Sequence, residues 1–334
     1  MRKNKLAIVG ATGLVGQTIL KVLEEKKLPI EDYTFFASSR SAGKKIKFLK
    51  NEYVVQELTP NSFDEEFTYA IFSAGATIAK DFAPIAASKG CIVIDNSSNF
   101  RMDTKVPLVV PEVNPEEINH HHGIIANPNC STIQAVVALK PLDDAYHMKR
   151  VIYSTYQAVS GAGHKGVVDL ESGIKSNSSY GYELQKFPVP IFNNCLPHID
   201  SFLENGYTKE EEKMINETRK ILKKPNLAIT ATTVRVPVLN SHSESINVEF
   251  EKDFELLELK ETLRNSHGIV VKDAPEFDLY PTTLDTNGKD EVFVGRIRRD
   301  FSVKSGVNLW VVADNLRKGA ASNAVQILEK LINC

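Results

Sequence analysis

The feature that most constrains the fold is a regular alternation of short apolar runs with helical patterns in the first third of the chain. The apolar runs, rich in β-branched and aromatic residues, are 6–9, 33–36, 69–72, 92–94 and 123–126. A helical pattern from about Leu14 to Glu25 follows the first run. Short strands that alternate with helices are typical of a doubly wound parallel sheet. We therefore expect an N-terminal α/β domain built on such a sheet.

The pattern changes from about Arg150 onward. Longer alternating runs at 151–156, 228–234 and 246–250 predict a mixed or antiparallel sheet with one exposed face. Between them, residues 171–182 are rich in Ser, Asn and Gly, so a loop or an interface excursion is expected there. Apolar residues at helical spacing from Asn315 to Ile332 predict a final helix, which could pack back on the first domain.

The composition excludes several classes of protein. The chain has 334 residues, which favours two domains, and its 40 basic and 42 acidic residues give a net charge of -2. So small a charge provides no field for holding nucleic acid. The N-terminus lacks the apolar region and cleavage site of a signal peptide, and no stretch approaches the roughly 18 apolar residues of a membrane span. A protein without membrane or nucleic-acid partners is expected, and the widely spaced cysteines described next fit a reducing cytoplasm.

The four cysteines are far apart and show neither CxxC pairs nor zinc-ligand spacing. They are Cys91, Cys130, Cys195 and the last residue, Cys334. No metal site is predicted. Only Cys130 has unusual neighbours, because Asn127-Pro128-Asn129 separates it from a β-like run and a helical pattern begins shortly after it.

A glycine-rich turn follows the first predicted strand. The segment Gly10-Ala11-Thr12-Gly13-Leu14-Val15-Gly16 opens a helix, which is the context of a dinucleotide-binding turn. Glycines let the backbone approach a pyrophosphate at the helix N-terminus. The spacing is GxxGxxG rather than GxGxxG, so a tight turn without ligand is the alternative.

The end of the second predicted strand indicates which cofactor fits. An acidic residue there would bind a ribose 2′-hydroxyl, whereas a basic residue accepts a 2′-phosphate. The segment Ser38-Ser39-Arg40-Ser41-Ala42-Gly43 has no carboxylate, and Arg40 can form charge-assisted hydrogen bonds. NADP is therefore favoured over NAD, and a solvated surface arginine is the alternative.

Cys130 is the candidate nucleophile. At a helix N-terminus, the partial positive charge and the free backbone N–H groups favour a thiolate and can stabilise an oxyanion. A cysteine that only caps or packs is the alternative. Beside a hydride carrier, a nucleophilic thiol indicates oxidoreduction between an acyl group and an aldehyde through a thioester or thiohemiacetal.

Further polar residues could serve this chemistry. His242 is a candidate acid/base, although an isolated histidine is more often structural. Arg235 lies on an otherwise apolar strand and could bind a substrate carboxylate or a protein carboxylate. Arg101 and Lys213 could receive a phosphate, and Lys213 alone would be read as a solvated helix residue.

Together the motifs resemble those of bacterial aspartate-semialdehyde dehydrogenases, in the same order and over essentially the whole chain. They are Gly-Ala-Thr-Gly-Leu-Val-Gly, Ser-Arg-Ser-Ala-Gly, Asn-Phe-Arg, Pro-Asn-Cys-Ser-Thr, Tyr-Gln-Ala-Val-Ser-Gly-Ala-Gly, Arg-Val-Pro-Val, His-Ser-Glu and Asp-Asn-Leu-Arg-Lys-Gly-Ala-Ala. The resemblance implies reductive dephosphorylation of L-aspartyl 4-phosphate by NADPH, in the route to lysine, threonine and methionine.

The resemblance also implies roles for individual residues. Cys130 would carry the acyl group, Gln157 would orient the substrate and His242 would be the acid/base, while Arg235 would bind the substrate carboxylate. The residues implied to hold the phosphate are Arg101 and Lys213, supported by Asn99 and Glu210. The residues implied to contact NADP are Gly10, Thr12, Gly13, Leu14, Val15, Arg40, Ser41, Ser160, Gly161 and Asn315.

The implied fold is a Rossmann-type NADP-binding domain, residues 1–128 with 315–334, and a glyceraldehyde-phosphate-dehydrogenase-like domain, residues 129–314, that catalyses and forms a homodimer. N-acetyl-glutamyl-phosphate reductase, which shares the thioester chemistry, is the nearest alternative. A nucleotide-binding regulator without activity is the alternative from another class.

Overall fold

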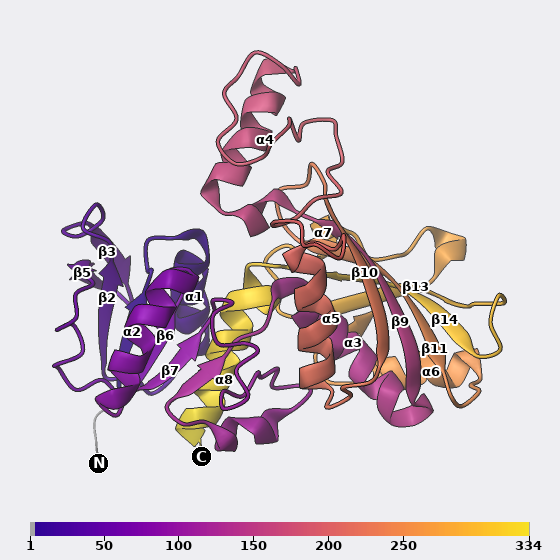
Figure 1. Cartoon of the computed structure of the whole chain (residues 1–334), viewed down its shortest axis with the longest axis horizontal. Coiled ribbons are helices and arrows are strands. Elements are labelled where there is room, and N and C mark those ends of the chain that lie inside the picture. Colours follow the sequence, from indigo (N-terminus) through magenta and orange to yellow (C-terminus); the bar gives the residue numbers. More distant parts are fainter. Residues whose placement is uncertain (1–3, 334) are drawn as a thin grey trace. The chain divides into compact units, whose positions relative to one another are not determined.

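A computed structural model of the protein describes residues 4–333, so Cys334 lies outside the described residues. The chain forms two compact units (Figure 1): Met1–Pro128 with Ala320–Cys334, and Asn129–Gly319. This division puts Asn315 in the second unit, whereas residues 315–319 were predicted to belong to the first domain.

The first unit contains a parallel sheet with the strand order β5-β2-β1-β6-β7-β8. The strands are β1 (Lys5–Val9), β2 (Asp32–Ala37), β5 (Gln56–Glu57), β6 (Tyr69–Phe72), β7 (Ile92–Asp95) and β8 (Ile124–Ala126). All neighbouring strands run parallel, as predicted. The chain passes from β1 to β2 on one side and later to β6 on the other, so β1 marks the topological switch point.

Helices cover both faces of this sheet. Alternate residues of the strands, including Leu6, Ile8 and Phe35, share a core with α1 (Leu14–Lys26) and α8 (Ser322–Asn333). Helix α2 (Ala76–Ser88) contacts β6 and β7, and its buried alanines are not part of that core. The final helix therefore packs in the first unit, although a π-helical segment, η4 (Arg317–Ala321), precedes it. Smaller elements are the hairpin β3 (Lys45–Phe48) and β4 (Asn51–Val54), and the 3₁₀ helix η1 (Pro115–His120).

The second unit contains a mixed sheet with the order β10-β9-β11-β14-β13-β12. The strands are β9 (Met148–Gln157), β10 (Ala228–Arg235), β11 (His242–Phe250), β12 (Ile269–Val271), β13 (Val292–Arg299) and β14 (Gly306–Ala313). The pairs β9/β10 and β12/β13 are parallel and the others antiparallel, which confirms the predicted mixed sheet.

One face of the mixed sheet carries helices. Contacts with the strands are made by α3 (Cys130–Tyr146), α5 (Lys209–Ile221) and α6 (Leu256–Arg264). Because side chains alternate along a strand, His242, Glu244 and Ile246 share this buried face, and Ser243 and Ser245 point to the other. Shorter elements of the unit are η2 (Val159–Ala162), η3 (Pro275–Phe277) and α7 (Thr283–Thr286).

The polar stretch 171–182 is helical over its first half, so the prediction of a loop there was wrong in part. Helix α4 (His164–Ser176) runs into it and ends at Asn177, whose φ of 49° is left-handed. Leu170 and Phe187 belong to a small apolar cluster that stabilises the helix, and a Cβ on Gly173 would lie 2.3 Å from Phe192. The Ser- and Gly-rich composition suits this close packing. The helix and the following loop extend away from the mixed sheet (Figure 1).

Within residues 4–333, no helix is both long enough and apolar enough to cross a membrane.

Candidate active site

The glycine turn packs tightly between three strands of the first unit. Gly10 donates its backbone N–H to Phe36 O over 2.8 Å, at the end of β2. Its φ is 88°, and a Cβ there would lie 2.4 Å from Ser73 O, just after β6. A Cβ on Gly16 would lie 2.2 Å from Gly10 O. These two glycines are therefore required for the close approach of α1 to the carboxyl edge of the sheet.

The N-terminus of α1 suits an anion. Its N-cap is Gly13, no side chain of residues 4–333 caps the helix, and its first turn has no acidic residue. A Cβ on Gly13 would contact only Gly10 O, at 3.5 Å, so the turn presents backbone rather than side chains. The uncapped N–H groups and the helix dipole fit the pyrophosphate of a dinucleotide.

Arg40 and Ser41 lie in a turn that follows β2. Ser41 donates its backbone N–H to Ser38 O over 2.8 Å. The Arg40 side chain is exposed, and within residues 4–333 it has no hydrogen bond or ion pair. It is therefore available for a phosphate, and no acidic residue of this turn competes for it.

Arg101 and Asn99 follow β7 in the first unit. Arg101 is 8% exposed, and it donates from Nε to Asn127 O over 2.9 Å and from Nη2 to Asn96 O over 3.1 Å. Asn99 is exposed. Backbone carbonyls thus fix the Arg101 guanidinium at the carboxyl edge of the parallel sheet.

Helix α3 of the second unit begins at Cys130, as the sequence predicted. Asn129 is the N-cap, and its Oδ1 accepts from Ser131 N at 3.0 Å and Thr132 N at 3.2 Å. A Cβ on Gly319 would lie 2.9 Å from Cys130 Cβ, so the absence of a side chain at 319 makes room for the nucleophile.

Two buried carboxylates of α5 hold this N-cap residue. Asn129 donates its backbone N–H to Glu217 Oε2 over 2.6 Å and its Nδ2 to Glu210 Oε1 over 2.8 Å. Glu217 is 1% exposed and Glu210 5%. Glu217 is not among the site residues predicted from the sequence. Its spacing of seven residues from Glu210 places both on one face of a helix, which was the available signal.

Glu210 is also bonded to two other predicted site residues. It accepts from Gln157 Nε2 at 3.2 Å and from Lys213 Nζ at 3.1 Å. Burial alone would raise the pKa of Glu210, but the Lys213 charge and the Asn129 hydrogen bond outweigh burial and hold that pKa below 4.5. Glu210 is therefore an ionised carboxylate that aligns Asn129, Gln157 and Lys213.

Arg235 is buried at the end of β10. Its Nη1 donates to Ala158 O over 2.7 Å, and its Nε has no partner among the described residues. Its charge interacts with Glu210 and with Cys130. A buried guanidinium with a free N–H can bind a substrate carboxylate and favours a thiolate nearby.

His242, the first residue of β11, is fully buried. Its Nδ1 accepts from Ala158 N at 3.0 Å, so the neutral ring carries its proton on Nε2. That atom has no partner within residues 4–333. Burial, then the Arg235 charge, lowers the pKa of His242 well below 6.5. The ring is neutral in this structure and presents an N–H donor.

The three second-unit residues implied to contact the cofactor lie beside His242 and Arg235. A Cβ on Gly161 would lie 3.0 Å from Arg235 Nη1 and 3.1 Å from His242 Nε2. Asn315 Oδ1 accepts from Ser241 N at 2.8 Å, and its Nδ2 donates to Ser160 Oγ over 3.0 Å. Ser241 directly precedes His242 and has a left-handed φ of 72°. Because Asn315 binds the Ser241 backbone N–H, it helps to hold this conformation and with it the position of His242.

Glu244 is a further buried carboxyl group, two residues beyond His242 on the same strand. It is fully buried, and neither of its oxygens has a hydrogen-bond partner among the described residues. Burial, then the Glu210 charge, raises the pKa of Glu244 well above 4.5. Unlike Glu210, it is therefore protonated. The alternation His-x-Glu in the sequence was the signal for its position.

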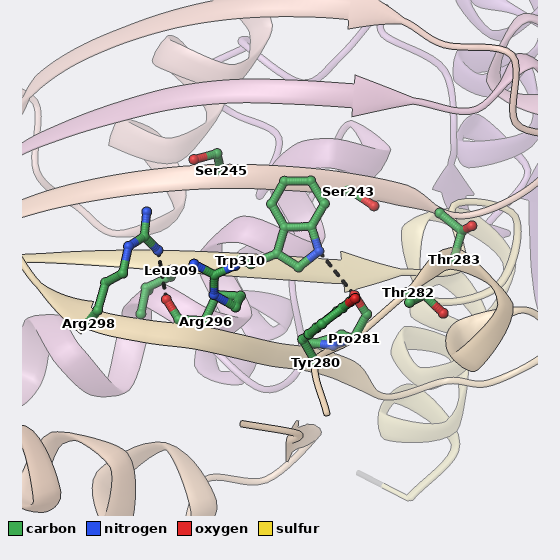
Figure 2. Close-up of a pocket in the computed structure, with 10 residues that line it drawn as sticks. All are labelled: Ser243, Ser245, Tyr280, Pro281, Thr282, Thr283, Arg296, Arg298, Leu309 and Trp310. Atoms are coloured by element: carbon green, nitrogen blue, oxygen red, sulfur yellow. Dashed lines mark hydrogen bonds between the residues drawn. The ribbon is translucent and has the colours of Figure 1, made fainter. Parts of the chain in front are cut away.

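A separate cavity of about 540 Å³ opens on the other face of the mixed sheet (Figure 2). It is lined by Ser243, Ser245, Tyr280, Pro281, Thr282, Thr283, Arg296, Arg298, Leu309 and Trp310. Trp310 Nε1 donates to Pro281 O over 3.1 Å at one wall. None of the predicted catalytic residues belongs to this cavity.

The chain has the architecture of a two-domain dehydrogenase. An α/β unit suited to a dinucleotide is joined to a mixed-sheet unit in which a cysteine begins a helix. Comparison with known proteins agrees: residues 5–121 match the NAD binding domain of semialdehyde dehydrogenases, and residues 139–318 match their dimerisation domain.

Individual relatives are similar over almost the whole chain. The aspartate-semialdehyde dehydrogenase of Aquifex aeolicus is 53% identical over 98% of both chains. The crystal structure of aspartate semialdehyde dehydrogenase II from Vibrio cholerae complexed with ASA has a TM-score of 0.95 and 45% identity, covering 100% of this chain and 99% of that one. The enzyme from Candida albicans with NADP has a TM-score of 0.77 and 28% identity, covering 98% of each chain.

The chain belongs to the aspartate-semialdehyde dehydrogenase family. It is an oxidoreductase, and the comparisons favour this activity over the two alternatives raised by the sequence.

Glu244→Gln tests the protonation of the buried carboxyl group. A carboxyl group whose pKa is raised in the folded state loses stabilising free energy as the pH rises from its unfolded value toward its folded value. The amide cannot ionise, so the variant should gain Tm relative to the unmodified protein as the pH rises above about 4.5, by about 2–4 °C for each kcal/mol. Thermal unfolding across pH measures this difference. A difference that does not vary with pH would contradict a protonated Glu244.

Proposed function

We propose that the chain catalyses the NADPH-dependent reductive dephosphorylation of L-aspartyl 4-phosphate to L-aspartate 4-semialdehyde and phosphate. The observation that carries the proposal is Cys130 at the capped N-terminus of α3, linked through Asn129 to Glu210 and Gln157. The relative from Vibrio cholerae, crystallised with ASA, supports this substrate class. We place the reaction in the route to lysine, threonine and methionine, in the cytoplasm.

Charged groups in the proposed site match an anionic substrate. Arg235, with an unpartnered Nε, would bind the substrate carboxylate. Lys213 of the second unit would bind the phosphate, with Glu210 orienting its ammonium group. Arg101 and Asn99 of the first unit are proposed to contact the phosphate as well.

The bond-forming step would use Cys130 as the nucleophile. Its thiolate, favoured by the α3 N-terminus and by the Arg235 charge, attacks the acyl carbon, and phosphate leaves as the thioester forms. The oxygen that gains negative charge would accept from backbone N–H groups of α3 and from His242 Nε2. Gln157 would orient the acyl group.

His242 is proposed as the acid/base residue, and its environment changes when substrate binds. The free site lowers the pKa of His242 through burial and the Arg235 charge. A substrate carboxylate on Arg235 would offset that charge, so the imidazole could then take up a proton more readily.

NADP is proposed as the cofactor, and the first unit fits it. Gly10, Thr12, Gly13, Leu14 and Val15 form the turn at the α1 N-terminus that would hold the pyrophosphate. Arg40 and Ser41 would hold the 2′-phosphate. When bound, the nicotinamide would supply the hydride that reduces the thioester carbon to a thiohemiacetal on Cys130. His242 would then accept the hydroxyl proton as the carbon–sulfur bond breaks, which releases the aldehyde and restores the Cys130 thiolate. Ser160, Gly161 and Asn315 are proposed further contacts.

A homodimer is proposed to form through the open face of the mixed sheet. This face is opposite to α3, α5 and α6, and it carries the cavity of Figure 2, which Trp310 lines. Tyr156, which pairs with Ser243 in the sheet register, has its ring 5.4 Å from that of Trp310. Aromatic side chains and arginines are enriched at protein interfaces. All ten lining residues fall within the segment that matches a dimerisation domain.

Cys130→Ala tests the thioester mechanism. We expect turnover to be abolished, because no other side chain supplies the nucleophile, while NADPH binding measured by fluorescence titration stays nearly unchanged. The control is Cys195→Ala, an exposed cysteine of the same unit, which should retain full activity. Full turnover by Cys130→Ala would refute the mechanism.

Arg40→Ala tests the cofactor preference. Loss of a charge-assisted contact should raise KM for NADPH about tenfold or more and change KM for NADH little. Lys80→Ala, an exposed cation of α2, serves as the control. An equal loss with both cofactors would argue against a 2′-phosphate contact.

Ser245→Arg tests the proposed dimer interface. Ser245 lies opposite Trp310 in the sheet register, so a third arginine beside Arg296 and Arg298 should repel a partner and shift the protein to monomer. Sedimentation equilibrium would measure the shift. Ser88→Arg, on an exposed end of α2, should leave the association state unchanged. A dimer that survives Ser245→Arg would place the interface elsewhere.

A further inference from the structure

Lys213, the proposed phosphate ligand of the second unit, is already bonded to two carboxylates. Its Nζ donates to Asp200 Oδ2 over 2.8 Å and to Glu210 Oε2 over 3.1 Å. Asp200 was not among the site residues predicted from the sequence. An ammonium group has three donors, so this arrangement leaves one for an incoming ligand.

The two carboxylates differ in how firmly they are held. The Glu210 side chain is 7% exposed and also accepts from Asn129 and Gln157. The Asp200 side chain is 38% exposed, and its Oδ2 has Lys213 as its only partner in the described part of the chain. Glu210 is therefore a fixed partner of Lys213, whereas Asp200 can be displaced toward solvent.

The backbone around Asp200 is anchored on both sides. Leu196 pairs with Arg235 through two backbone hydrogen bonds, of 2.9 and 2.8 Å, and Lys209 donates its backbone N–H to Ser201 O over 2.9 Å. Asp200 itself has a φ of 67°, and its Oδ1 accepts from Ser201 N at 2.8 Å. These contacts hold the carboxylate next to Lys213 without burying it.

Phosphate would have to compete with two carboxylates for the Lys213 ammonium group. Lys213 and Arg235 carry two positive charges, and Glu210 and Asp200 carry two negative charges that balance them. A phosphate dianion that approaches Lys213 is repelled by both carboxylates. The phosphate binds most favourably if the Asp200 carboxylate moves away, because the phosphate then replaces Asp200 as the second acceptor on the Lys213 ammonium group.

We propose that Asp200 is a displaceable counter-ion of Lys213. Its carboxylate occupies a donor of the Lys213 ammonium group that phosphate would otherwise bind, and it thereby lowers the affinity of the site for phosphate. This positioning role rests on the proposed function, in which Lys213 binds the phosphate. Asp200 keeps the Lys213 side chain ordered between turnovers. Its return to Lys213 favours release of phosphate after the thioester has formed.

Asp200→Asn tests the proposal in the direction that consumes phosphate. Initial rates of NADPH formation from aspartate semialdehyde, NADP and phosphate give separate KM values for the two substrates. We expect KM for phosphate to fall about 3- to 10-fold, because one competing charge is removed, while KM for the semialdehyde changes less than about twofold. Asp200→Ser provides a second variant that likewise removes the charge.

Two matched variants make the result specific. Asp144→Asn removes an exposed carboxylate that pairs with Lys140 on α3, and it should change neither KM. In a Lys213→Ala background, Asp200→Asn should have no further effect on KM for phosphate, because a counter-ion acts only through its partner.

The outcomes separate this inference from the proposed function. If Lys213→Ala raises KM for phosphate but Asp200→Asn leaves it unchanged or raises it, the counter-ion role is wrong and the phosphate site stands. If Lys213→Ala leaves KM for phosphate unchanged, the proposed role of Lys213 fails, and the inference fails with it.

Discussion

The hydrogen bonds that hold Asn129 are the interaction on which the site of the second unit depends. Asn129 is the N-cap of α3, and two carboxylates of α5 bind its backbone N–H and its side-chain amide. Helix α5 is itself started by a capping box, in which Thr208 and Glu211 bond reciprocally. A helix far along the chain thus determines where Cys130 lies. Because these carboxylates are buried and hydrogen-bonded, their positions are well defined. They fix Asn129, and therefore also the adjacent nucleophile Cys130.

Buried glutamates of this unit differ in charge according to the partners they have. Glu210 and Glu244 are both buried, yet Glu210 has Lys213, Asn129 and Gln157 as partners, and Glu244 has none among the described residues. The first is held ionised and the second protonated. His242 is kept neutral by the same principle, since its burial and the nearby Arg235 both oppose a positive charge. Of these three groups, Glu210 is a strongly anchored anion, whereas Glu244 and His242 are neutral groups that could titrate when the substrate changes the local field.

The first unit achieves its geometry through sterics rather than through charge. Gly10 and Gly16 let α1 approach the ends of β2 and β6 more closely than any side chain would permit. Gly13 and the absence of acidic residues leave the first turn of α1 open to an anion. Glycines serve the second unit in the same way, because Gly319 lies against Cys130 and Gly161 lies against the Arg235 and His242 side chains. Small residues thus create space at the places where substrate and cofactor are proposed to bind.

The sequence by itself determined the parallel sheet of the first unit, three strands of the mixed sheet, the first and last helices, the start of α3 and the family. The strand periodicity, the glycine turn before α1 and the position of Cys130 at the start of α3 are local properties, fixed by residues a few positions apart. The sequence failed where a polar composition hid a packed helix, as in α4, whose Gly173 is required by contact with Phe192. Only the tertiary structure decided that Glu217 binds Asn129, that Asp200 pairs with Lys213, and that Glu244 lacks a partner. The physical reason is that charge, protonation and hydrogen bonding depend on burial and on neighbours distant in sequence, which no local pattern records.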